Sequence, residues 1–299
     1  MRIALAGLAT SHPYTDASTL REHCELAVWE PDPARLQRFR DEHPQVDVLP
    51  DLTSLLATRP DGVMLTVPTP QVPAALRHVL DLRVPCFVNK PAAATADQLA
   101  ELDDVVAAAP ELVFSSSVLR FAPAFTRLRA DLDAAEPPLA ARVTVRHDAR
   151  FWAAGNNPWQ DDPEAGGGML VLLGVHGVEL LVALFGPDVR LVGAVTARRH
   201  YRSLRSEDTA LLTLAWEGGP VGIVEVLASG SGEAYEVAVH GPATTATVTL
   251  EGGDDPRHAL GYRGAVEAFL AMVAGQPSPV PWPQTQAILK VLTAARATA

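Results

Sequence analysis

The chain is poor in cysteine, because its 299 residues include only Cys24 and Cys86. These two lie far apart in sequence, and neither belongs to a Cys-x-x-Cys motif or to a spacing that suits metal ligands. Isolated cysteines are typical of a reducing compartment, so we expect a cytoplasmic protein. Positive charge is also scarce, since 24 Lys and Arg face 35 Asp and Glu and the net charge is −11. This balance argues against nucleic acid or an anionic membrane as the main partner.

Long hydrophobic runs are rare as well. One stretch, residues 166–185, is long and apolar enough to resemble a membrane span. It carries His176 and Glu179 in its middle and has no basic flanks, so it predicts a buried core helix instead. The one basic cluster, four arginines between residues 198 and 205, is followed directly by Glu207 and Asp208. We therefore expect a solvated loop there rather than a phosphate-binding patch.

The first third of the chain alternates between short apolar runs and helical patterns. Strands are predicted at 2–6, 25–29, 62–67, 85–88 and 111–116. Helices are predicted at 17–23, 33–43, 71–82 and 94–108. Strand–helix alternation with short connections indicates a doubly wound parallel sheet, as in Rossmann-type α/β domains. We place this domain at residues 1–119.

The pattern changes after about residue 120. Strands are predicted at 140–148, 189–196, 209–216, 221–226, 234–241 and 244–250, and helices at 169–185, 264–274 and 284–298. Gly, Asp or Pro separates several of the strands. This indicates an α+β domain with a largely antiparallel open sheet at residues 120–299, whose last helix, 284–298, is expected to pack back on the first domain.

The turn after the first strand lacks two of the glycines that a dinucleotide site normally has. It reads Gly7-Leu8-Ala9-Thr10-Ser11-His12, which keeps only the first glycine of G-x-G-x-x-G. Ala9 puts a methyl group where backbone should approach phosphate, and His12 replaces the glycine that lets helix pack on strand. The following helix is expected to begin either at Pro13 or after Asp16. An ordinary strand–turn–helix without a ligand is also compatible with this sequence. If the turn does bind a pyrophosphate, we expect weak binding through Gly7, Ala9, Thr10, Ser11 and His12.

Glu30 ends the second strand about 20 residues past this turn, where a carboxylate accepts the ribose hydroxyls of a dinucleotide. The same carboxylate would repel the 2′-phosphate of NADP, so NAD is the expected cofactor. Arg35 lies near enough in sequence to weaken that repulsion.

More specific motifs lie at the ends of the third, fourth and fifth strands and in the long apolar segment. They read Val67-Pro68-Thr69-Pro70, Val88-Asn89-Lys90-Pro91, Arg120-Phe121-Ala122-Pro123, and Gly166-Gly167-Gly168 continuing to Gly174-Val175-His176-Gly177-Val178-Glu179. In this order and spacing, the chain resembles the glucose–fructose oxidoreductase / inositol dehydrogenase (Gfo/Idh/MocA) family over nearly its whole length. That family has Glu-Lys-Pro after the fourth strand and Gly-Gly-Gly-x-x-x-Asp-x-Gly-x-His-x-x-Asp in the second domain.

The resemblance implies that Lys90 lies beside the nicotinamide and the reacting hydroxyl, and that residues 172 and 176 point into the active site. Lys90 and His176 are therefore the expected catalytic residues. Further cofactor contacts are expected from Pro68, Thr69 and Asn89, and substrate contacts from Arg120, Asn156, Asn157, Trp159 and Glu179. The resemblance also implies a homo-oligomer formed through the open face of the second sheet. Two histidines without a nearby carboxylate at metal spacing make no metal site, so none is expected.

Two departures from the family pattern concern carboxylates. Leu172 stands where the family has an active-site Asp, and Asn89 stands where it has Glu. The leading hypothesis is an NAD(P)-dependent oxidoreductase that acts on a sugar, cyclitol or related polyol. One alternative is non-redox chemistry, such as elimination or hydrolysis, with His12 and His176 as acid and base. The other is a non-catalytic relative that binds nucleotide or sugar.

Overall fold

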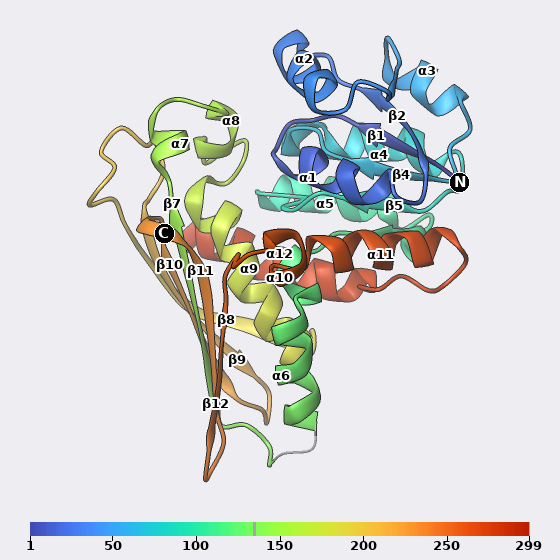
Figure 1. The fold of residues 1–299 in the computed structure, drawn as a ribbon. Helices are drawn as coiled ribbons and strands as arrows, with labels where there is room; N and C mark the ends of the chain where they lie inside the picture. Colours follow the sequence, from blue (N-terminus) through green and yellow to red (C-terminus); the bar gives the residue numbers. More distant parts are fainter. Residues whose placement is uncertain (134–135, 299) are drawn as a thin grey trace.

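The computed structural model describes residues 1–133 and 136–298, in which the chain forms two six-stranded sheets (Figure 1). All strands of the first sheet are parallel, in the order β3-β2-β1-β4-β5-β6. The second has the order β12-β11-β7-β10-β9-β8, and its strands are antiparallel except for the β7–β10 pair. The predicted fold class is therefore confirmed. Residues 134, 135 and 299 belong to the predicted second domain but lie outside the described residues.

The first sheet is built by short, almost fully buried strands. They are β1 (Arg2–Ala6), β2 (Glu25–Trp29), β3 (Asp47–Val48), β4 (Gly62–Leu65), β5 (Cys86–Val88) and β6 (Val113–Phe114). The helices and 3-10 turns between them are α1 (His12–Leu20), α2 (Pro33–Glu42), α3 (Leu52–Ala57), η1 (Thr69–Gln71), α4 (Val72–Leu80), α5 (Ala96–Val106) and η2 (Pro110–Leu112). The turn η3 (Val118–Phe121) follows β6, and the predicted division of the chain after residue 119 falls inside it. That division stays a prediction.

Helix α1 begins at His12 with Ser11 as its N-cap, one residue before Pro13, the earlier of its two expected starts. The later start, after Asp16, and the range predicted at 17–23 are therefore wrong. Pro13 lies in the first turn of the helix, where a missing N–H costs nothing. Asp16 does not cap the helix but is buried within it. The short elements β3 and α3, and helix α6 (Pro123–Asp133), are also absent from the sequence-based prediction.

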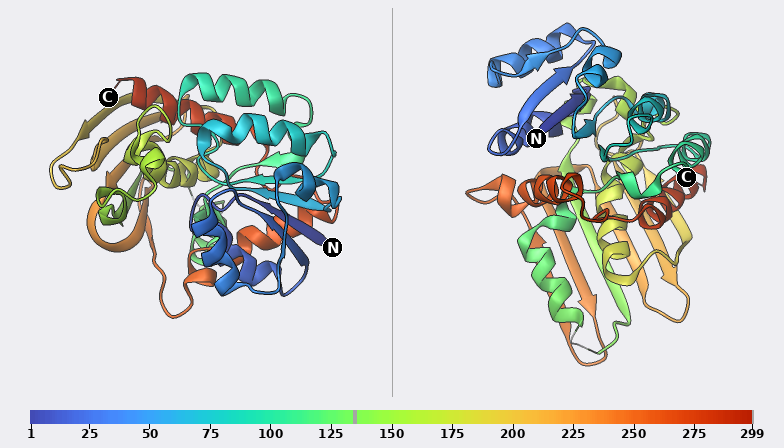
Figure 2. Two further views of the ribbon diagram at one scale, coloured as in Figure 1. Left: turned by 90° about the horizontal axis from the view of Figure 1, so that it is seen from above. Right: turned by 90° about the vertical axis from the view of Figure 1, so that its right-hand side faces the viewer.

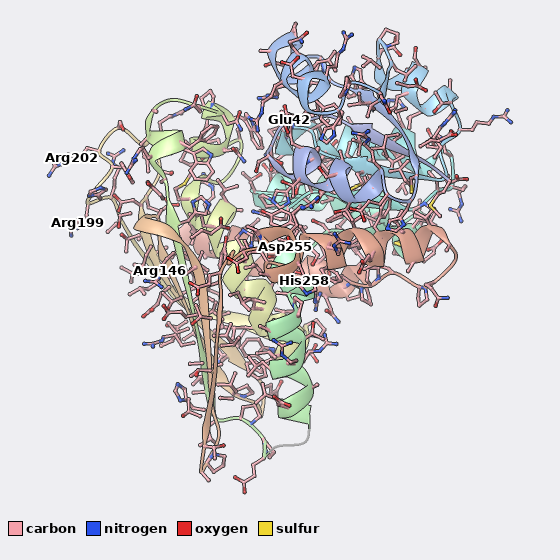
Figure 3. All side chains as sticks on the ribbon, in the orientation of Figure 1. Glu42, Arg146, Arg199, Arg202, Asp255 and His258 are labelled. Carbon is pink, nitrogen blue, oxygen red and sulfur yellow. The ribbon has the colours of Figure 1, made fainter. Side chains whose placement is uncertain are left out.

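The second sheet is covered on its inner face by one central helix. Its strands are β7 (Ala140–Asp148), β8 (Val189–Ala197), β9 (Thr209–Trp216), β10 (Val221–Leu227), β11 (Ser229–His240) and β12 (Thr245–Leu250). Its helices are α7 (Arg150–Ala153), α8 (Pro158–Asp161), α9 (Gly168–Phe185), α10 (Pro256–Ala259), α11 (Tyr262–Val273) and α12 (Trp282–Thr298). Helix α9 is long and apolar enough to cross a membrane, but 83% of it is buried in the protein, so it is a core helix. The arginines between residues 198 and 205 are exposed, and Arg199 and Arg202 project from the tip of a loop (Figure 3).

The two C-terminal helices connect the second sheet to the first (Figures 1 and 2). Phe269 on α11 packs against Phe87 and Phe114, which lie on neighbouring strands of the first sheet. Helix α12 contacts both α9 and α5, and the indole N–H of Trp282 donates a hydrogen bond of 2.9 Å to Asp103 on α5. These helices hold the carboxyl edge of the first sheet facing α9.

The turn after β1 depends on the one glycine that it keeps. Gly7 has φ +90°, and a Cβ at this position would lie 2.5 Å from the carbonyl oxygen of Thr66 on the adjacent chain segment. Both the conformation and the close approach therefore require glycine. The bend brings residues 8–12 over the end of the sheet.

We expect Gly7→Ala to lower the free energy of unfolding by about 3 kcal/mol or more, because a positive φ costs about 1–2 kcal/mol and the clash with backbone adds to it. Gly275→Ala is the matched control, since Gly275 has φ +97° but a Cβ added there would meet nothing within 4 Å. Denaturant unfolding of both variants measures the difference. Equal losses of stability would show that the contact with Thr66 is unimportant.

Candidate active site

A cavity of about 480 Å³ lies between the carboxyl edge of the first sheet and the inner face of the second domain. One end is formed by the turn after β1 together with Arg35 and Arg38 of α2, and the other by Lys90, His176 and the aromatic side chains around them. The residues that line it are Leu8, Ala9, Thr10, Ser11, His12, Tyr14, Ala34, Arg35, Arg38, Lys90, Val118, Leu119, His147, Phe151, Trp152, Asn157, Gln160, Leu172, Leu173, His176, Glu233, Tyr235, Leu260 and Tyr262. Apolar side chains such as Leu8, Leu119 and Leu172 alternate in this lining with polar and charged ones, a mixture that can orient a small polar molecule.

The two predicted catalytic residues meet in this cavity. Lys90 lies two residues after the end of β5 and precedes a cis peptide bond to Pro91, and its Nζ lies 2.8 Å from Nε2 of His176 on α9. Burial disfavours the charged amine and lowers the pKa of Lys90 from 10.5 to about 8, although the carboxylates of Glu233 and Glu179 act in the opposite direction. A lysine tuned in this way changes protonation close to neutral pH, as a general acid or base requires.

His176 is held in one orientation from both sides. Burial, followed by the charge of Lys90, lowers the pKa of His176 well below 6.5, so the ring is neutral. The ammonium of Lys90 can only donate, so Nε2 accepts a hydrogen bond from it and Nδ1 carries the hydrogen of the neutral ring. Nδ1 lies 2.6 Å from Oγ of Ser117 and donates to it. Ser117 therefore selects the tautomer that can pair with Lys90.

Arg120 and Glu179, two of the predicted substrate-binding residues, do not line the cavity. Glu179 accepts hydrogen bonds from the hydroxyl of Ser116 and, at 2.6 Å, from the backbone N–H of Ser117. Arg120 lies 3.7 Å from the same carboxylate and donates to Gln284 of α12. Burial raises the pKa of Glu179, while Arg120 and the two serines favour its charged form. In this arrangement both residues fix the loop that positions His176.

The predicted phosphate-binding turn has already committed two of its N–H groups. Leu8 donates to the carboxylate of Glu30, and Ala9 donates to the carbonyl oxygen of Thr66 at 3.0 Å. Thr10 and Ser11 line the cavity. Asn89 does not line it, and its amide donates to the hydroxyl of Thr10 at 2.7 Å. An arriving phosphate would therefore find fewer free N–H groups here than a full glycine-rich turn offers.

His12 lies closer to Lys90 than its predicted role in phosphate binding implies. Its ring is 5.2 Å from that of Tyr262, and both residues line the cavity. Burial and the nearby charge of Lys90 lower the pKa of His12 to about 3, so this ring is neutral as well. Pro68 and Thr69, two predicted cofactor contacts, do not line the cavity. Thr69 is the first residue of η1, and its hydroxyl donates to the carbonyl oxygen of Pro91 at 3.5 Å.

Glu30 is buried, with 6% of its surface exposed, and does not itself line the cavity. Its carboxylate accepts from Leu8 and, at 2.9 Å, from the N–H of Asp32. Burial raises the pKa of Glu30, and those two N–H groups oppose the rise. Arg35 lies 3.8 Å from Glu30 and also faces the cavity.

Asn157 is the predicted substrate contact that does reach the cavity. It has φ +44°, donates to the carbonyl oxygen of Ala9 at 3.2 Å, and accepts from Arg35 at 3.2 Å. It thereby ties α8 to the turn and to α2. Asn156 is exposed and bonds only within its own loop, to the carbonyl oxygen of Phe151, and Trp159 does not line the cavity.

Leu172 lines the cavity one helical turn before His176, so the position where the family pattern has Asp does face the site. Sequence reasoning missed Ser117, Glu233, Tyr235 and Tyr262. Ser117 lies three residues before the Arg-Phe-x-Pro motif, which is the one signal that could have marked it. The others come from strand β11 and from the start of α11, where no motif distinguishes them from neighbouring residues.

Ser117→Ala should leave Nδ1 of His176 without its partner and cost about 1–3 kcal/mol of stability, the usual penalty for an unsatisfied buried group. The tautomer should then no longer be fixed, which nitrogen-15 NMR of the His176 ring detects. Ser203→Ala, which removes an exposed hydroxyl bonded to Ala153, is the control. Unchanged ring shifts in Ser117→Ala would show that the hydroxyl does not set the tautomer.

Because the N–H groups of Leu8 and Ala9 already donate to Glu30 and Thr66, they are not free to bind phosphate. We therefore expect NAD and NADH to bind with dissociation constants above about 1 μM. Restoring the two glycines, in a variant with Ala9→Gly and His12→Gly, should tighten binding about tenfold or more. Isothermal titration calorimetry of both proteins measures this. Submicromolar binding by the unmodified chain would contradict the expectation.

Comparison with known proteins agrees with this fold. Residues 137–247 match the family model of the GFO/IDH/MocA C-terminal domain. The whole chain superposes on GenD2 from gentamicin A biosynthesis, solved in complex with NAD, with a TM-score of 0.87, 20% identity and coverage of 100% of this chain and 94% of that one. A myo-inositol dehydrogenase from Corynebacterium glutamicum gives a TM-score of 0.84 at 16% identity, with 100% of this chain and 96% of that one covered.

An oxidoreductase from Agrobacterium radiobacter, in complex with NAD+, L-tartaric acid and magnesium, gives a TM-score of 0.81 at 18% identity, with 100% and 96% of the two chains covered. No curated protein sequence matches the chain. At these identities the solved structures establish the fold. Together with the family model, they confirm the resemblance that the motifs indicate: the chain carries the C-terminal domain of the Gfo/Idh/MocA family on the fold of these oxidoreductases.

Proposed function

We propose that this protein is an NAD-dependent oxidoreductase that acts on a CH–OH group of a sugar, cyclitol or related polyol. The observation that carries the proposal is the 2.8 Å contact between Lys90 and His176 at one end of a cavity whose other end is the turn after β1. A proton-transfer pair and a dinucleotide turn in one cavity are what an alcohol dehydrogenase needs.

The residues present fit a nicotinamide nucleotide. Thr10 and Ser11 would hold the pyrophosphate at the start of α1, with the ribose near Glu30 and the nicotinamide end near Lys90. When bound, the nucleotide supplies the hydride acceptor or donor. Asn157 would cover the turn from the second domain, since it already contacts the carbonyl oxygen of Ala9.

We propose NAD rather than NADP because the two arginines at this end of the cavity are engaged. Arg35 donates to Asn157, and Arg38 lies 4.3 Å over the ring of Tyr14 and 3.2 Å from Glu42. A 2′-phosphate would have to break these contacts and approach Glu30. Tighter binding of NADPH than of NADH in calorimetry would overturn this part of the proposal.

The protein's own groups move the proton. At neutral pH the ammonium of Lys90 would donate to the oxygen of the substrate hydroxyl, as it already donates to neutral His176. With a pKa lowered to about 8, Lys90 becomes a free amine at mildly alkaline pH and takes the hydroxyl proton as the C–H bond breaks. Oxidation should therefore speed up as pH rises through about 8, and reduction should slow down over the same range.

The non-redox alternative needs a group that is protonated at neutral pH. His12 and His176 both line the cavity, but burial lowers the pKa of each, so neither ring is charged there. This favours the oxidoreductase over an elimination in which the two histidines act as acid and base.

Self-association through the outer face of the second sheet is part of the proposal. Val195, Leu211 and Ile223 are 68%, 45% and 42% exposed on β8, β9 and β10. Exposed apolar side chains on one sheet face are typical of an interface. We also propose a cytoplasmic location, which suits the two free cysteines. A monomeric mass in light scattering would overturn the proposed self-association.

Lys90→Ala should reduce turnover by about a hundredfold or more while the fold persists, because general acid–base catalysis contributes factors of this size. Absorbance of the reduced nicotinamide, followed with a panel of cyclitols and sugars, is the measurement. Lys290→Ala is the control, since Lys290 is exposed on α12 and is the chain's other lysine. A folded Lys90→Ala variant with full activity would exclude the assigned role. Failure of every polyol to reduce NAD in the unmodified protein would overturn the proposed function itself.

A further inference from the structure

The cavity contains a carboxylate that none of the motifs marks. Of the described residues that line it, Glu233 is the one acidic side chain. It faces the same space as Lys90, His176 and the apolar side chain of Leu172. The carboxylate therefore comes from the second sheet rather than from the central helix.

An irregularity in β11 places Glu233 there. The pairing of β11 with β7 shifts register between Ser229 and Ala234, and Glu233 lies within that shift. Such bulges re-aim side chains at the rims of sheets. Two residues later, the buried Tyr235 lies on the same face, with its ring 5.2 Å from that of His176.

Tyr235 holds this carboxylate in the site. Its hydroxyl donates to Oε1 of Glu233, so the aromatic ring that touches His176 also anchors Glu233. Among the described residues, Oε2 of Glu233 receives no hydrogen bond within the chain and is available to a ligand. Glu236, three residues after Glu233, lies on the opposite face, where it pairs with Arg146 at 2.7 Å.

The charged and titratable groups that face Lys90 come from three elements. His12 on α1 and His176 on α9 are neutral, while Glu179 on α9 and Glu233 on β11 favour the ammonium. Glu179 already binds Ser116, Ser117 and Arg120. Glu233 favours the ammonium of Lys90 more than Glu179 does and also raises the pKa of Tyr262.

We propose that Glu233 is the active-site carboxylate of this protein, which stabilises the protonated form of Lys90 and accepts a hydrogen bond from a second hydroxyl of the substrate through Oε2. The proposal rests on the proposed function for its substrate contact, whereas the electrostatic effect of Glu233 on Lys90 needs no substrate. The substrate class that follows carries a hydrogen-bond donor next to the reacting CH–OH group, as a vicinal diol does.

The first experiment needs neither substrate nor cofactor. The chain has two lysines, so carbon-13 labelling of the lysine ε-carbon gives one signal for Lys90 and one for the exposed Lys290, which is the internal reference. In Glu233→Gln, the pKa of Lys90 should fall by about half a unit or more, because a stabilising negative charge is lost. Glu236→Gln, which removes a carboxylate from the outer face of the same strand, should leave it unchanged.

Equal titration of Lys90 in Glu233→Gln and in the unmodified protein would overturn the electrostatic part of the proposal, whatever the outcome of activity assays. Glu233→Asp is the second variant, because it keeps the charge and should give a smaller shift than Glu233→Gln. A shift as large in Glu233→Asp or in Glu236→Gln would also contradict the assignment.

The second experiment tests the substrate contact with an active vicinal diol found in the assay above. Glu233→Gln should raise KM for this diol about tenfold, but change KM much less for a substrate of the same ring size with a single hydroxyl. Equal KM changes for the two substrates would overturn the hydrogen bond. If no polyol is active, the proposed function has failed, and the lysine titration still decides whether Glu233 acts on Lys90.

Discussion

The site depends on the burial of one ammonium group against a neutral imidazole. Lys90 is 9% exposed, and its Nζ lies 2.8 Å from Nε2 of His176. Taking an ammonium out of water is unfavourable, which lowers its pKa to about 8. The cost is tolerable because His176 accepts its hydrogen bond and because Glu179 and Glu233 lie close enough to favour the charge. The surrounding structure keeps His176 neutral and oriented for this purpose.

A chain of buried polar contacts extends from this pair into the scaffold. Ser117 is hydrogen-bonded to Nδ1 of His176, and its backbone N–H donates to the carboxylate of Glu179. Arg120 lies beside the same carboxylate and donates to Gln284 on α12. Helix α12 in turn packs on both α9 and α5. Helix α12 thus supports the pair of Lys90 and His176, although it contributes no residue to the cavity lining. Buried networks of this kind rigidify a site when each member has its partner.

The sequence predicts the strands well, because alternating or continuous apolar runs report burial on a sheet directly. The family resemblance also places Lys90 and His176 in one cavity, as the structure has them. For Lys90 there is a physical reason as well, because the carboxyl ends of parallel strands meet at one edge of the sheet. Prediction from the sequence fails where tertiary context decides. The short strand β3 has too few residues to show a period. Arg120 and Glu179 belong to the recognised motifs, but they turn away from the cavity and hold the loop at Ser117. Glu233 could not be found at all, because a shift in strand register leaves no signature among single residues.

The central claim is that Lys90 and His176 form one proton-transfer pair in which only the lysine titrates near neutral pH. Nitrogen-15 NMR of the His176 ring, followed from acidic to alkaline pH, tests it most directly. We expect Nδ1 to stay protonated and Nε2 to stay unprotonated throughout, with one step in the Nε2 shift near pH 8, when the ammonium that donates to it becomes a neutral amine, which is a weaker donor. A His176 ring that takes up its own proton near its ordinary pKa of 6.5, with no step near 8, would contradict the account.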